Sequence, residues 1–188
     1  MNKPRYSVIT PSIGRHSLIK TCESLLRQTY ENWEHIIVLD NGQLPKGLPT
    51  DDRQLVMICP EWHNNWGNTC RRMGWLAARG TYCYYLDDDN ELAHPEVLAD
   101  LCQVAAPWAL APIIKDGGLF FHYPPEHGTV DTGNVLASRE LAKWPDVSVY
   151  EADWLYVKSL LPFRCQLLPG LRPVMRMPKS NRGELCPS

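Results

Sequence analysis

Short apolar runs alternate with segments of helical periodicity in the first half of the chain. Continuous apolar runs predict four strands, at residues 6–10, 35–39, 55–59 and 82–86. Apolar residues at helical spacing predict helices at 18–28 and 69–78, and Gly80 follows the second as a stop signal. Strands without polar alternation indicate a sheet covered on both faces. The order β, α, β, β, α, β therefore predicts an α/β fold with a mostly parallel central sheet flanked by helices.

The second half has shorter and less regular runs. Apolar segments predict strands at 109–114 and 119–123, and Asp116-Gly117 between them is a hairpin signal, so a small antiparallel edge is expected. Ser138 is expected to cap a short helix that ends at Leu141, and a longer helix is expected at 153–161.

From Pro162 onward, repeated prolines predict an irregular tail. This tail is basic, through Arg164, Arg172, Arg176, Lys179 and Arg182. It is expected either to approach an anionic ligand or carrier or to remain a solvated end. Because no repeat or linker divides the chain, we expect one domain over residues 1–188, made of 1–100, 101–161 and the tail 162–188.

Composition and charge narrow the class of protein. The 188 residues are 44% hydrophobic and carry a net charge of -2, which disfavours a nucleic-acid binder held by a general positive field. No apolar run approaches the ~20 residues that cross a bilayer, and the start lacks a signal-peptide core, so we expect a cytoplasmic chain without an integral membrane segment. The seven scattered cysteines include no Cys-x-x-Cys pair, so reduced thiols are expected rather than disulfides or a zinc site.

Three consecutive carboxylates, Asp87, Asp88 and Asp89, follow the strand predicted at 82–86. Adjacent carboxylates at the end of a buried strand repel one another unless a cation neutralises them. Mg²⁺ or Mn²⁺ bound by one or two carboxylates keeps open positions for diphosphate oxygens. In open α/β sheets, ligands bind beyond the carboxyl ends of the strands, where Asp40 is also expected. A solvated acidic turn that caps the next helix is the alternative.

Several motifs in order resemble the glycosyltransferases of family two, which have the GT-A fold. The motifs are residues 6–15 (YSVITPSIGR), 24–30 (SLLRQTY), 36–42 (IIVLDNG), 78–82 (ARGTY) and 86–90 (LDDDN). The resemblance covers the first half of the chain densely and implies a Rossmann-like sheet that binds a nucleotide-sugar through residues 1–100 and an acceptor through 101–161.

The resemblance also implies roles for single residues. Asp40 would accept a hydrogen bond from a uracil-like base, and an Asx turn before Gly42 is the alternative. Asp89 would be the main metal ligand, with Asp88 and Asp87 beside it. The remaining nucleotide-sugar contacts would come from Pro11, Ser12, Ile13 and Arg71, with Asp87 and Asp88 near the ribose or the sugar.

The resemblance continues less closely at 132–134 (TGN) and 150–154 (YEADW), and the second of these segments implies Asp153 as the candidate catalytic base. An inverting transfer needs such a carboxylate to take the proton of the attacking hydroxyl. The alternative is a carboxylate that only stabilises a helix N-terminus, and Glu151 is the second candidate base. His94, His122 and His127 are considered as further metal ligands, although a surface role is expected for each. Trp66 and Trp154 are candidates for stacking on a sugar ring.

The sequence therefore predicts a metal-dependent glycosyltransferase that uses Mn²⁺ or Mg²⁺. It would move a sugar from a nucleotide diphosphate, with a UDP-sugar favoured, to a hydroxyl of a saccharide or glycan acceptor. A non-catalytic sugar-nucleotide or glycan-binding module of the same fold is the first alternative. A sugar-phosphate nucleotidyltransferase is the second, although 11–15 (PSIGR) lacks the glycine-rich phosphate loop expected of one.

Overall fold

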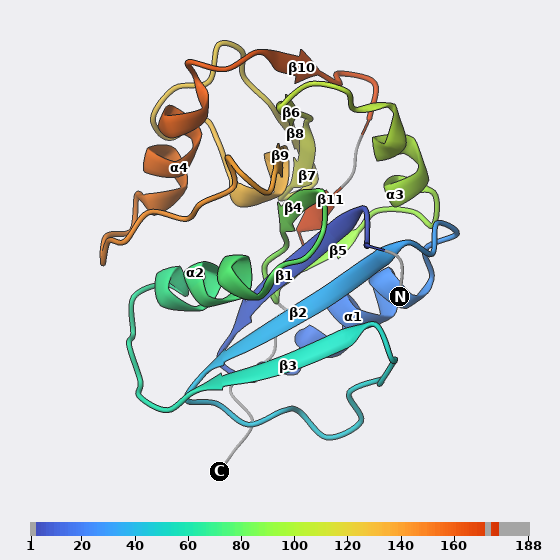
Figure 1. The fold of residues 1–188 in the computed structure, drawn as a ribbon, viewed down its shortest axis with the longest axis vertical. Coiled ribbons are helices and arrows are strands. Elements are labelled where there is room, and N and C mark those ends of the chain that lie inside the picture. Colours follow the sequence, from blue (N-terminus) through green and yellow to red (C-terminus); the bar gives the residue numbers. More distant parts are fainter. Residues whose placement is uncertain (1–2, 172–173, 177–188) are drawn as a thin grey trace.

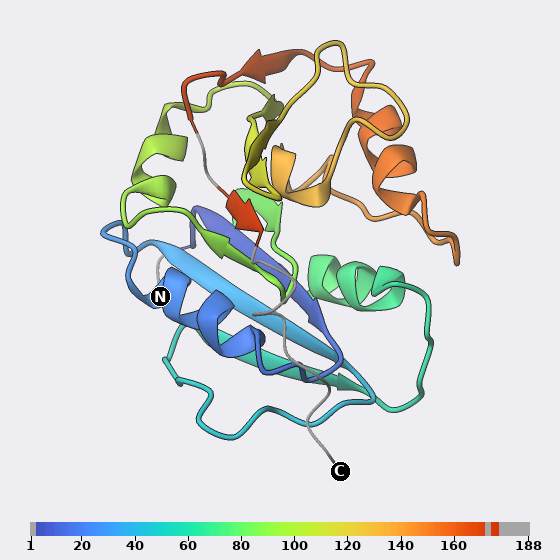
Figure 2. The same cartoon turned by 180° about the vertical axis from the view of Figure 1, so that it is seen from behind.

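Two β-sheets and the helices around them make up the described part of the chain, residues 3–171 and 174–176, in this computed structural model (Figures 1 and 2). The larger sheet has seven strands in the order β10-β6-β9-β4-β1-β2-β3, and the smaller has four in the order β5-β11-β7-β8. The elements of the first half are β1 (Tyr6–Ser12), α1 (Leu18–Leu26), β2 (Trp33–Asp40), β3 (Gln54–Cys59), α2 (Asn68–Ala77), β4 (Tyr82–Tyr85) and β5 (Asn90–Leu92). Those of the second half are α3 (Val97–Asp100), η1 (Leu101–Gln103), β6 (Trp108–Leu110), β7 (Ile113–Lys115), β8 (Gly118–Phe120), η2 (Thr132–Asn134), β9 (Val135–Ser138), α4 (Ala152–Leu160), β10 (Cys165–Leu167) and β11 (Val174–Arg176).

The larger sheet is mostly parallel, as predicted. β1 lies between β2 and β4 and runs parallel to both, and β3 continues the parallel arrangement beyond β2. β9 runs antiparallel to its neighbours β4 and β6, and β10 runs parallel to β6. The predicted α/β class is therefore confirmed, with antiparallel pairs on the far side of β4.

The continuous apolar run of β2 is explained by helices on both faces of the sheet. Ile36 and Val38 belong to the core cluster on the α2 side, whereas Ile37 and Leu39 belong to a separate cluster with α1. The two views show α1 and α2 on opposite faces of the strands (Figures 1 and 2). Successive side chains of a strand point to opposite faces, so a strand buried on both faces must be apolar throughout.

β3 departs from this pattern because it is the edge strand of the larger sheet. Leu55, Val56 and Ile58 are exposed, although their apolar run led us to expect cover on both faces. That expectation is wrong for β3, since an apolar strand can also lie at a sheet edge.

The region predicted as one strand at 109–114 is two strands in different sheets. β6 pairs with β9 and β10, whereas β7 pairs with β8 and β11. Pro112 lies between them and has no N–H to donate, so it interrupts the ladder. The hairpin signal is confirmed: Lys115 pairs with Gly118, and Asp116 and Gly117 have φ values of 51° and 78°. Positive φ at both central residues is the requirement of a two-residue type I′ turn.

The prediction that Ser138 caps a helix is wrong. Ser138 is the last residue of β9, where it pairs with Tyr82 of β4 and its backbone N–H donates to the Pro107 carbonyl at 2.7 Å. Sheet pairing between two distant segments therefore overrides the local helix-start signal. The helix predicted at 153–161 is confirmed as α4, which begins one residue earlier.

The prediction of an irregular tail from Pro162 onward is wrong for two segments. Cys165 pairs with Trp108 in the larger sheet, and Val174 pairs with Leu92 in the smaller one. Each of these strands has three residues, too few to produce a periodic signal. Arg172, Lys179 and Arg182 lie outside the described residues.

His35 is a fully buried histidine inside the larger sheet. Its Nε2 atom lies 2.9 Å from the Thr10 hydroxyl, while its Nδ1 atom has no hydrogen-bond partner. Burial lowers the pKa of His35 to about 3, so the folded protein holds it neutral at pH values where the unfolded chain protonates it near 6.5.

Stability is therefore expected to fall as the pH drops below about 6.5, by up to ~1.4 kcal/mol per pH unit from His35 alone. The unfolded state binds the proton in this window and the folded state does not, so the loss continues until the pH nears the folded-state value of about 3. The free energy of unfolding should be measured between pH 7.5 and about 5 for the native chain and for His35→Gln. Asp88, whose pKa is raised to about 6, changes the free energy of unfolding in the opposite direction over this range. Because both proteins contain Asp88, the difference between their pH slopes isolates the contribution of His35. Equal pH slopes in the two proteins would refute this role of His35.

Candidate functional site

A cavity of about 530 Å³ opens beyond the carboxyl ends of β1, β2 and β4. Parallel strands present these ends at one edge of the sheet, which is where α/β proteins bind ligands. The nine residues to which the sequence analysis gave a main nucleotide-sugar, metal or catalytic role all line this one cavity: Pro11, Ser12, Ile13, Asp40, Arg71, Asp87, Asp88, Asp89 and Asp153. The structure thus brings together residues separated by up to 142 positions in the chain.

The turn between β4 and β5 carries the three aspartates. The Leu86 N–H donates to the Ile9 carbonyl at 3.0 Å, which extends the pairing of β4 with β1 to the edge of the turn. The Asn90 N–H then donates to the Asp87 carbonyl at 3.0 Å and closes the turn. This fixed backbone sets the three carboxylates at the cavity wall.

Asp88 is buried and tied to the end of β1. The Ser12 hydroxyl donates to its Oδ2 atom at 2.7 Å, and Arg15 Nη1 lies 3.5 Å from its Oδ1 atom. Burial raises the pKa of Asp88 to about 6; Arg15 and Ser12 act against this rise, and the charges of Asp89 and Asp87 add to it. A positive charge next to this turn would therefore stabilise its ionised form.

Arg71, on the first turns of α2, pairs with Asp87 at 2.5 Å between Nη2 and Oδ1. Its Nη1 atom donates to the Trp66 carbonyl at 2.7 Å, and its guanidinium lies 4.8 Å from the ring centre of the buried Trp144. Its Nε atom is buried and has no hydrogen-bond partner.

Asp40, the last residue of β2, receives several hydrogen bonds from the segment before α2. The His63 N–H and the His63 imidazole lie 3.0 Å and 2.9 Å from its Oδ1 atom, and the Asn64 N–H donates to Oδ2 at 3.1 Å. A carboxylate has about four acceptor positions, so a further donor can still be accepted.

The segment that leads into α2 has an unusual backbone. Asn64, Trp66 and Gly67 all have positive φ values, 46°, 56° and 77°. A Cβ atom at Gly67 would lie 2.8 Å from Pro11 Cβ, so only glycine lets the start of α2 approach β1 this closely. Asn64 and Trp66 also line the cavity, which is where strained backbone of this kind is commonly found.

The opposite wall of the cavity comes from the second half of the chain. Asp153 lies near the start of α4, with its Oδ1 atom accepting from the Trp154 N–H at 2.7 Å. Burial raises its pKa, and the nearby charges of Asp131 and Asp87 add to the rise. Lys115 Nζ lies 3.2 Å from Asp131 Oδ2 on the same wall. Asp153 therefore lines the same cavity as the three-aspartate turn, with its proton affinity raised.

Aromatic residues gather where the two walls meet. Trp66 and Tyr150 are 58% and 73% exposed, and their ring centres are 6.0 Å apart in an edge-to-face arrangement. Trp154 also lines the cavity and lies 6.3 Å from the ring of His127. Of the three histidines considered, His127 lines the cavity, whereas His94 lies beside Glu96 and His122 beside the Pro124 carbonyl.

The charges of the cavity fit a divalent cation. Its lining contains seven carboxylates against three basic side chains: Asp40, Asp87, Asp88, Asp89, Asp131, Glu151 and Asp153 against Arg15, Arg71 and Lys115. Clustered oxygen ligands of this type suit Mg²⁺ or Mn²⁺. The residues present are therefore a suitable ligand set, and three of them, Asp87, Asp88 and Asp89, are consecutive in the turn after β4.

Sequence reasoning missed several residues of the cavity. Arg15 was noted only as part of a motif, while Lys115, Asp131 and Asn64 were not selected at all. Their neighbours in sequence are turns and short strands without a distinctive pattern. Only the fold, which places all four residues in the cavity lining, shows that they belong to the site.

The mostly parallel sheet with a cavity at its strand ends is the arrangement in which α/β folds bind ligands. Residues 7–106 match the model of Glycosyl transferase family 2, which is more than half of the chain, and the chain belongs to this family. The match contains the three-aspartate turn and Asp40, while Asp131 and Asp153 lie beyond it.

Individual relatives agree with this assignment. The chain is 32% identical over 95 residues to the putative colanic acid biosynthesis glycosyl transferase WcaA of Escherichia coli (strain K12), a match of 48% of this chain and 34% of WcaA. The chain therefore spans about a third of this curated relative.

A membrane-spanning helix is absent from the described residues, whose helices lack the length and apolar character that a bilayer requires.

Solved structures show the same fold at low sequence identity. The structure of TarS 1-349 from S. aureus in complex with UDP covers 93% of this chain with a TM-score of 0.73 at 15% identity, and 60% of that chain is covered. The mannosyltransferase PcManGT from Pyrobaculum calidifontis, in complex with GDP-Man and Mn²⁺, covers 97% of this chain with a TM-score of 0.65 at 17% identity, and 59% of that chain is covered. The GT-A fold predicted from the sequence is confirmed.

Proposed function

We propose that this chain is a metal-dependent inverting glycosyltransferase that moves a sugar from a nucleotide diphosphate, with a UDP-sugar favoured, to a hydroxyl of a saccharide or related acceptor. The observation that carries the proposal is that Asp153 and the three-aspartate turn line one cavity although they lie far apart in the sequence. Transfer needs a cation that neutralises the leaving diphosphate and a base that takes the proton of the attacking hydroxyl. A cavity lined by both sets of carboxylates can provide the ligands for the cation and the base.

The donor would lie against the strand ends of the first half. Asp40 would accept the imide N–H of a uracil-like base, which is why a UDP-sugar is favoured. Pro11, Ser12 and Ile13 would contact the base and ribose, and Arg71 would lie near the base or the phosphates. The complexes of structural relatives with UDP and with GDP-Man support a nucleotide-sugar donor in general.

The three-aspartate turn would hold Mn²⁺ or Mg²⁺, with Asp89 as the main ligand and Asp88 and Asp87 beside it. Such an ion neutralises the charge that grows on the leaving diphosphate. The hydrogen bond from Ser12 and the ion pair with Arg71 would hold Asp88 and Asp87 in place.

On the other wall, Asp153 would take the proton of the acceptor hydroxyl as its oxygen forms a bond to the anomeric carbon. The bond from that carbon to the diphosphate oxygen breaks on the opposite side, which inverts the anomeric centre. A raised pKa makes the Asp153 carboxylate a stronger base than an ordinary exposed aspartate. Glu151 lines the same cavity and remains the second candidate.

The function is tested by measuring the release of nucleoside diphosphate from UDP-, GDP- and dTDP-sugars with Mn²⁺, Mg²⁺ or a chelator, with and without mixed saccharide acceptors. We expect release from a UDP-sugar that depends on the metal and increases with acceptor. Release of pyrophosphate would instead indicate a nucleotidyltransferase. Donor binding without any turnover would indicate a non-catalytic binding module.

The exposed pair Trp66 and Tyr150 favours a saccharide acceptor. Flat apolar ring faces at the rim of a polar cavity suit a pyranose ring, which is apolar on one face and carries hydroxyls at its edge. Asn68 Nδ2 donates to the Val149 carbonyl at 3.0 Å, which holds the two aromatic segments together.

Trp66→Ala is expected to raise the KM for the acceptor about tenfold, because a lost ring contact is worth ~1.4 kcal/mol, while the KM for the donor changes little. The hydrogen bond from Arg71 to the Trp66 backbone carbonyl survives this substitution. The matched control is Tyr123→Ala, which removes an aromatic ring that is 53% exposed outside the cavity. An unchanged acceptor KM in Trp66→Ala would remove this residue from the acceptor site.

A further inference from the structure

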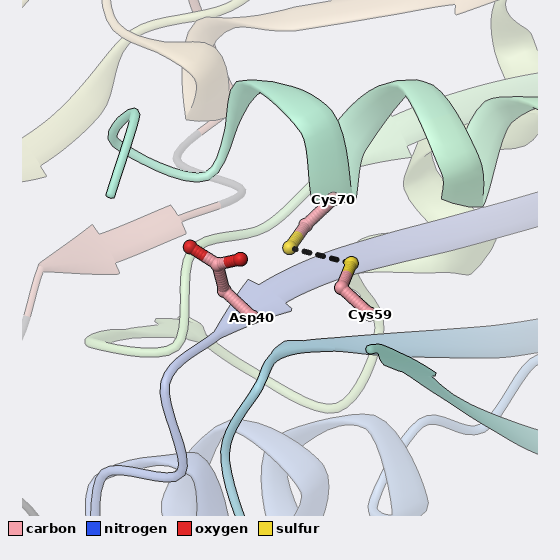
Figure 3. A group of neighbouring side chains, drawn as sticks. All are labelled: Asp40, Cys59 and Cys70. Atoms are coloured by element: carbon pink, nitrogen blue, oxygen red, sulfur yellow. Dashed lines mark hydrogen bonds between the residues drawn. The ribbon is translucent and has the colours of Figure 1, made fainter. Parts of the chain in front are cut away.

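A second group of possible metal-ligand atoms lies at Asp40, one of the residues that line the cavity. It consists of Asp40 at the end of β2, Cys59 at the end of β3 and Cys70 near the start of α2 (Figure 3). One ligand atom from each of the three lies within 4.8 Å of the other two, and the sulfur atoms are 3.7 Å apart. All three side chains are buried, and they point toward one another.

We propose that Asp40, Cys59 and Cys70 form a binding site for a thiophilic divalent cation of the zinc class. Two zinc–sulfur bonds of about 2.3 Å at a tetrahedral angle hold the sulfur atoms ~3.8 Å apart. The sulfur separation of 3.7 Å already agrees with this geometry. One carboxylate oxygen supplies a third ligand, and a fourth position remains for water or another donor.

The chemistry of this group differs from that of the three-aspartate turn. Thiolates select zinc-class ions, whereas sites made of oxygen atoms alone select Mg²⁺ and Mn²⁺. Burial raises the pKa of the Cys59 and Cys70 thiols, so both are protonated before a cation binds. The charge of a bound divalent ion offsets the cost of burying two thiolates.

The surroundings of the group support a built site. Asp40 lines the cavity and gives a route of entry, while both cysteines have no exposed surface. The His63 imidazole, 2.9 Å from Asp40 Oδ1, orients the carboxylate in the way that a second layer of hydrogen bonds supports metal ligands. Met73 Sδ lies 3.3 Å from Cys59 Sγ and closes the inner side.

The sequence led us to expect no zinc site because it contains no Cys-x-x-Cys pair. Cys59 and Cys70 are eleven residues apart, and the fold brings them together because β3 and α2 both lie beside β2. Neither residue has a role in the proposed transfer, so the site can be tested separately.

Occupation of this site should oppose donor binding, a consequence that rests on the proposed function. Asp40 is the proposed acceptor for the base, and a cation on its carboxylate would compete with the imide N–H. A zinc-class ion is therefore expected to weaken the binding of a uridine nucleotide, whereas Mg²⁺ is not.

The test is titration of the full chain with Cd²⁺ in excess Mg²⁺, following the thiolate-to-cadmium charge-transfer absorption in the ultraviolet. We expect one Cd²⁺ per chain. Cys59→Ser, Cys70→Ser and Asp40→Asn should each weaken binding at least about tenfold, since even loss of a supporting hydrogen bond costs that much. Cys22→Ser, which removes a buried thiol on α1, should bind as the native chain does.

Asp40→Asn keeps both thiols and so guards against a serine variant that fails to fold. An absent charge-transfer band, or equal affinity in the native chain and all three ligand variants, would overturn the site. UDP binding is then measured with and without Cd²⁺. If Cd²⁺ binds through the thiolates but UDP affinity is unchanged, the metal site stands and the role of Asp40 in base binding fails instead.

Discussion

Asp89→Ala is expected to lower metal-stimulated sugar transfer at least about a thousandfold, because the cation that would neutralise the diphosphate charge then loses its main ligand. Asp89 is buried in the wall of the cavity. Its neighbours Asp87 and Asp88 already pair with Arg71 and Ser12. The rate of UDP release from a UDP-sugar should be measured across a range of Mn²⁺ concentrations. We expect the variant to need far more metal or to show no stimulation at all.

The control for Asp89→Ala is Glu91→Ala. Glu91 lies two residues further on, pairs with Arg27 at 3.8 Å and does not line the cavity. It should keep the native rate and the native metal response. Native metal dependence in Asp89→Ala would assign the metal to other carboxylates.

Asp153→Asn is expected to lower kcat roughly a hundred- to ten-thousandfold, the usual contribution of a general base, while donor binding is retained. Asparagine preserves the shape of the side chain but cannot accept the proton. Single-turnover transfer to a saccharide acceptor and calorimetric binding of UDP with Mn²⁺ together separate chemistry from binding.

Two further variants make the result for Asp153 specific. Asp146→Asn changes an exposed carboxylate that pairs with Arg72 and should leave kcat unchanged. Glu151→Gln changes the second candidate base. If Glu151→Gln loses the activity and Asp153→Asn keeps it, the base is Glu151.

Much of the nucleotide-binding half could be predicted from the sequence because its signals are local. The apolar runs of β1, β2 and β4 and the periodicity of α1 and α2 lie within single segments. The acidic turn follows directly from the end of β4. Parallel strands then place Asp40 and the aspartates at the same edge without further information.

The second half was predicted less well because its structure depends on distant pairings. β9 is inserted between β4 and β6, and β10 and β11 are short strands that exist only through their partners. The same is true of the cavity: Lys115 and Asp131 become site residues only when the fold brings them together. Asp153 was selected correctly as a cavity residue because a family resemblance pointed to it, while its catalytic role stays a prediction.

The position of β9 also means that the region matching the family model does not contain all the strands of its own sheet. The match ends at residue 106, whereas β4, the strand that leads into the acidic turn, has β9 along one of its two edges. A chain cut at 106 would present that edge as a row of unpaired backbone groups, a template for aggregation. It would also lack Asp153 and the rest of the cavity lining that comes from the second half of the chain.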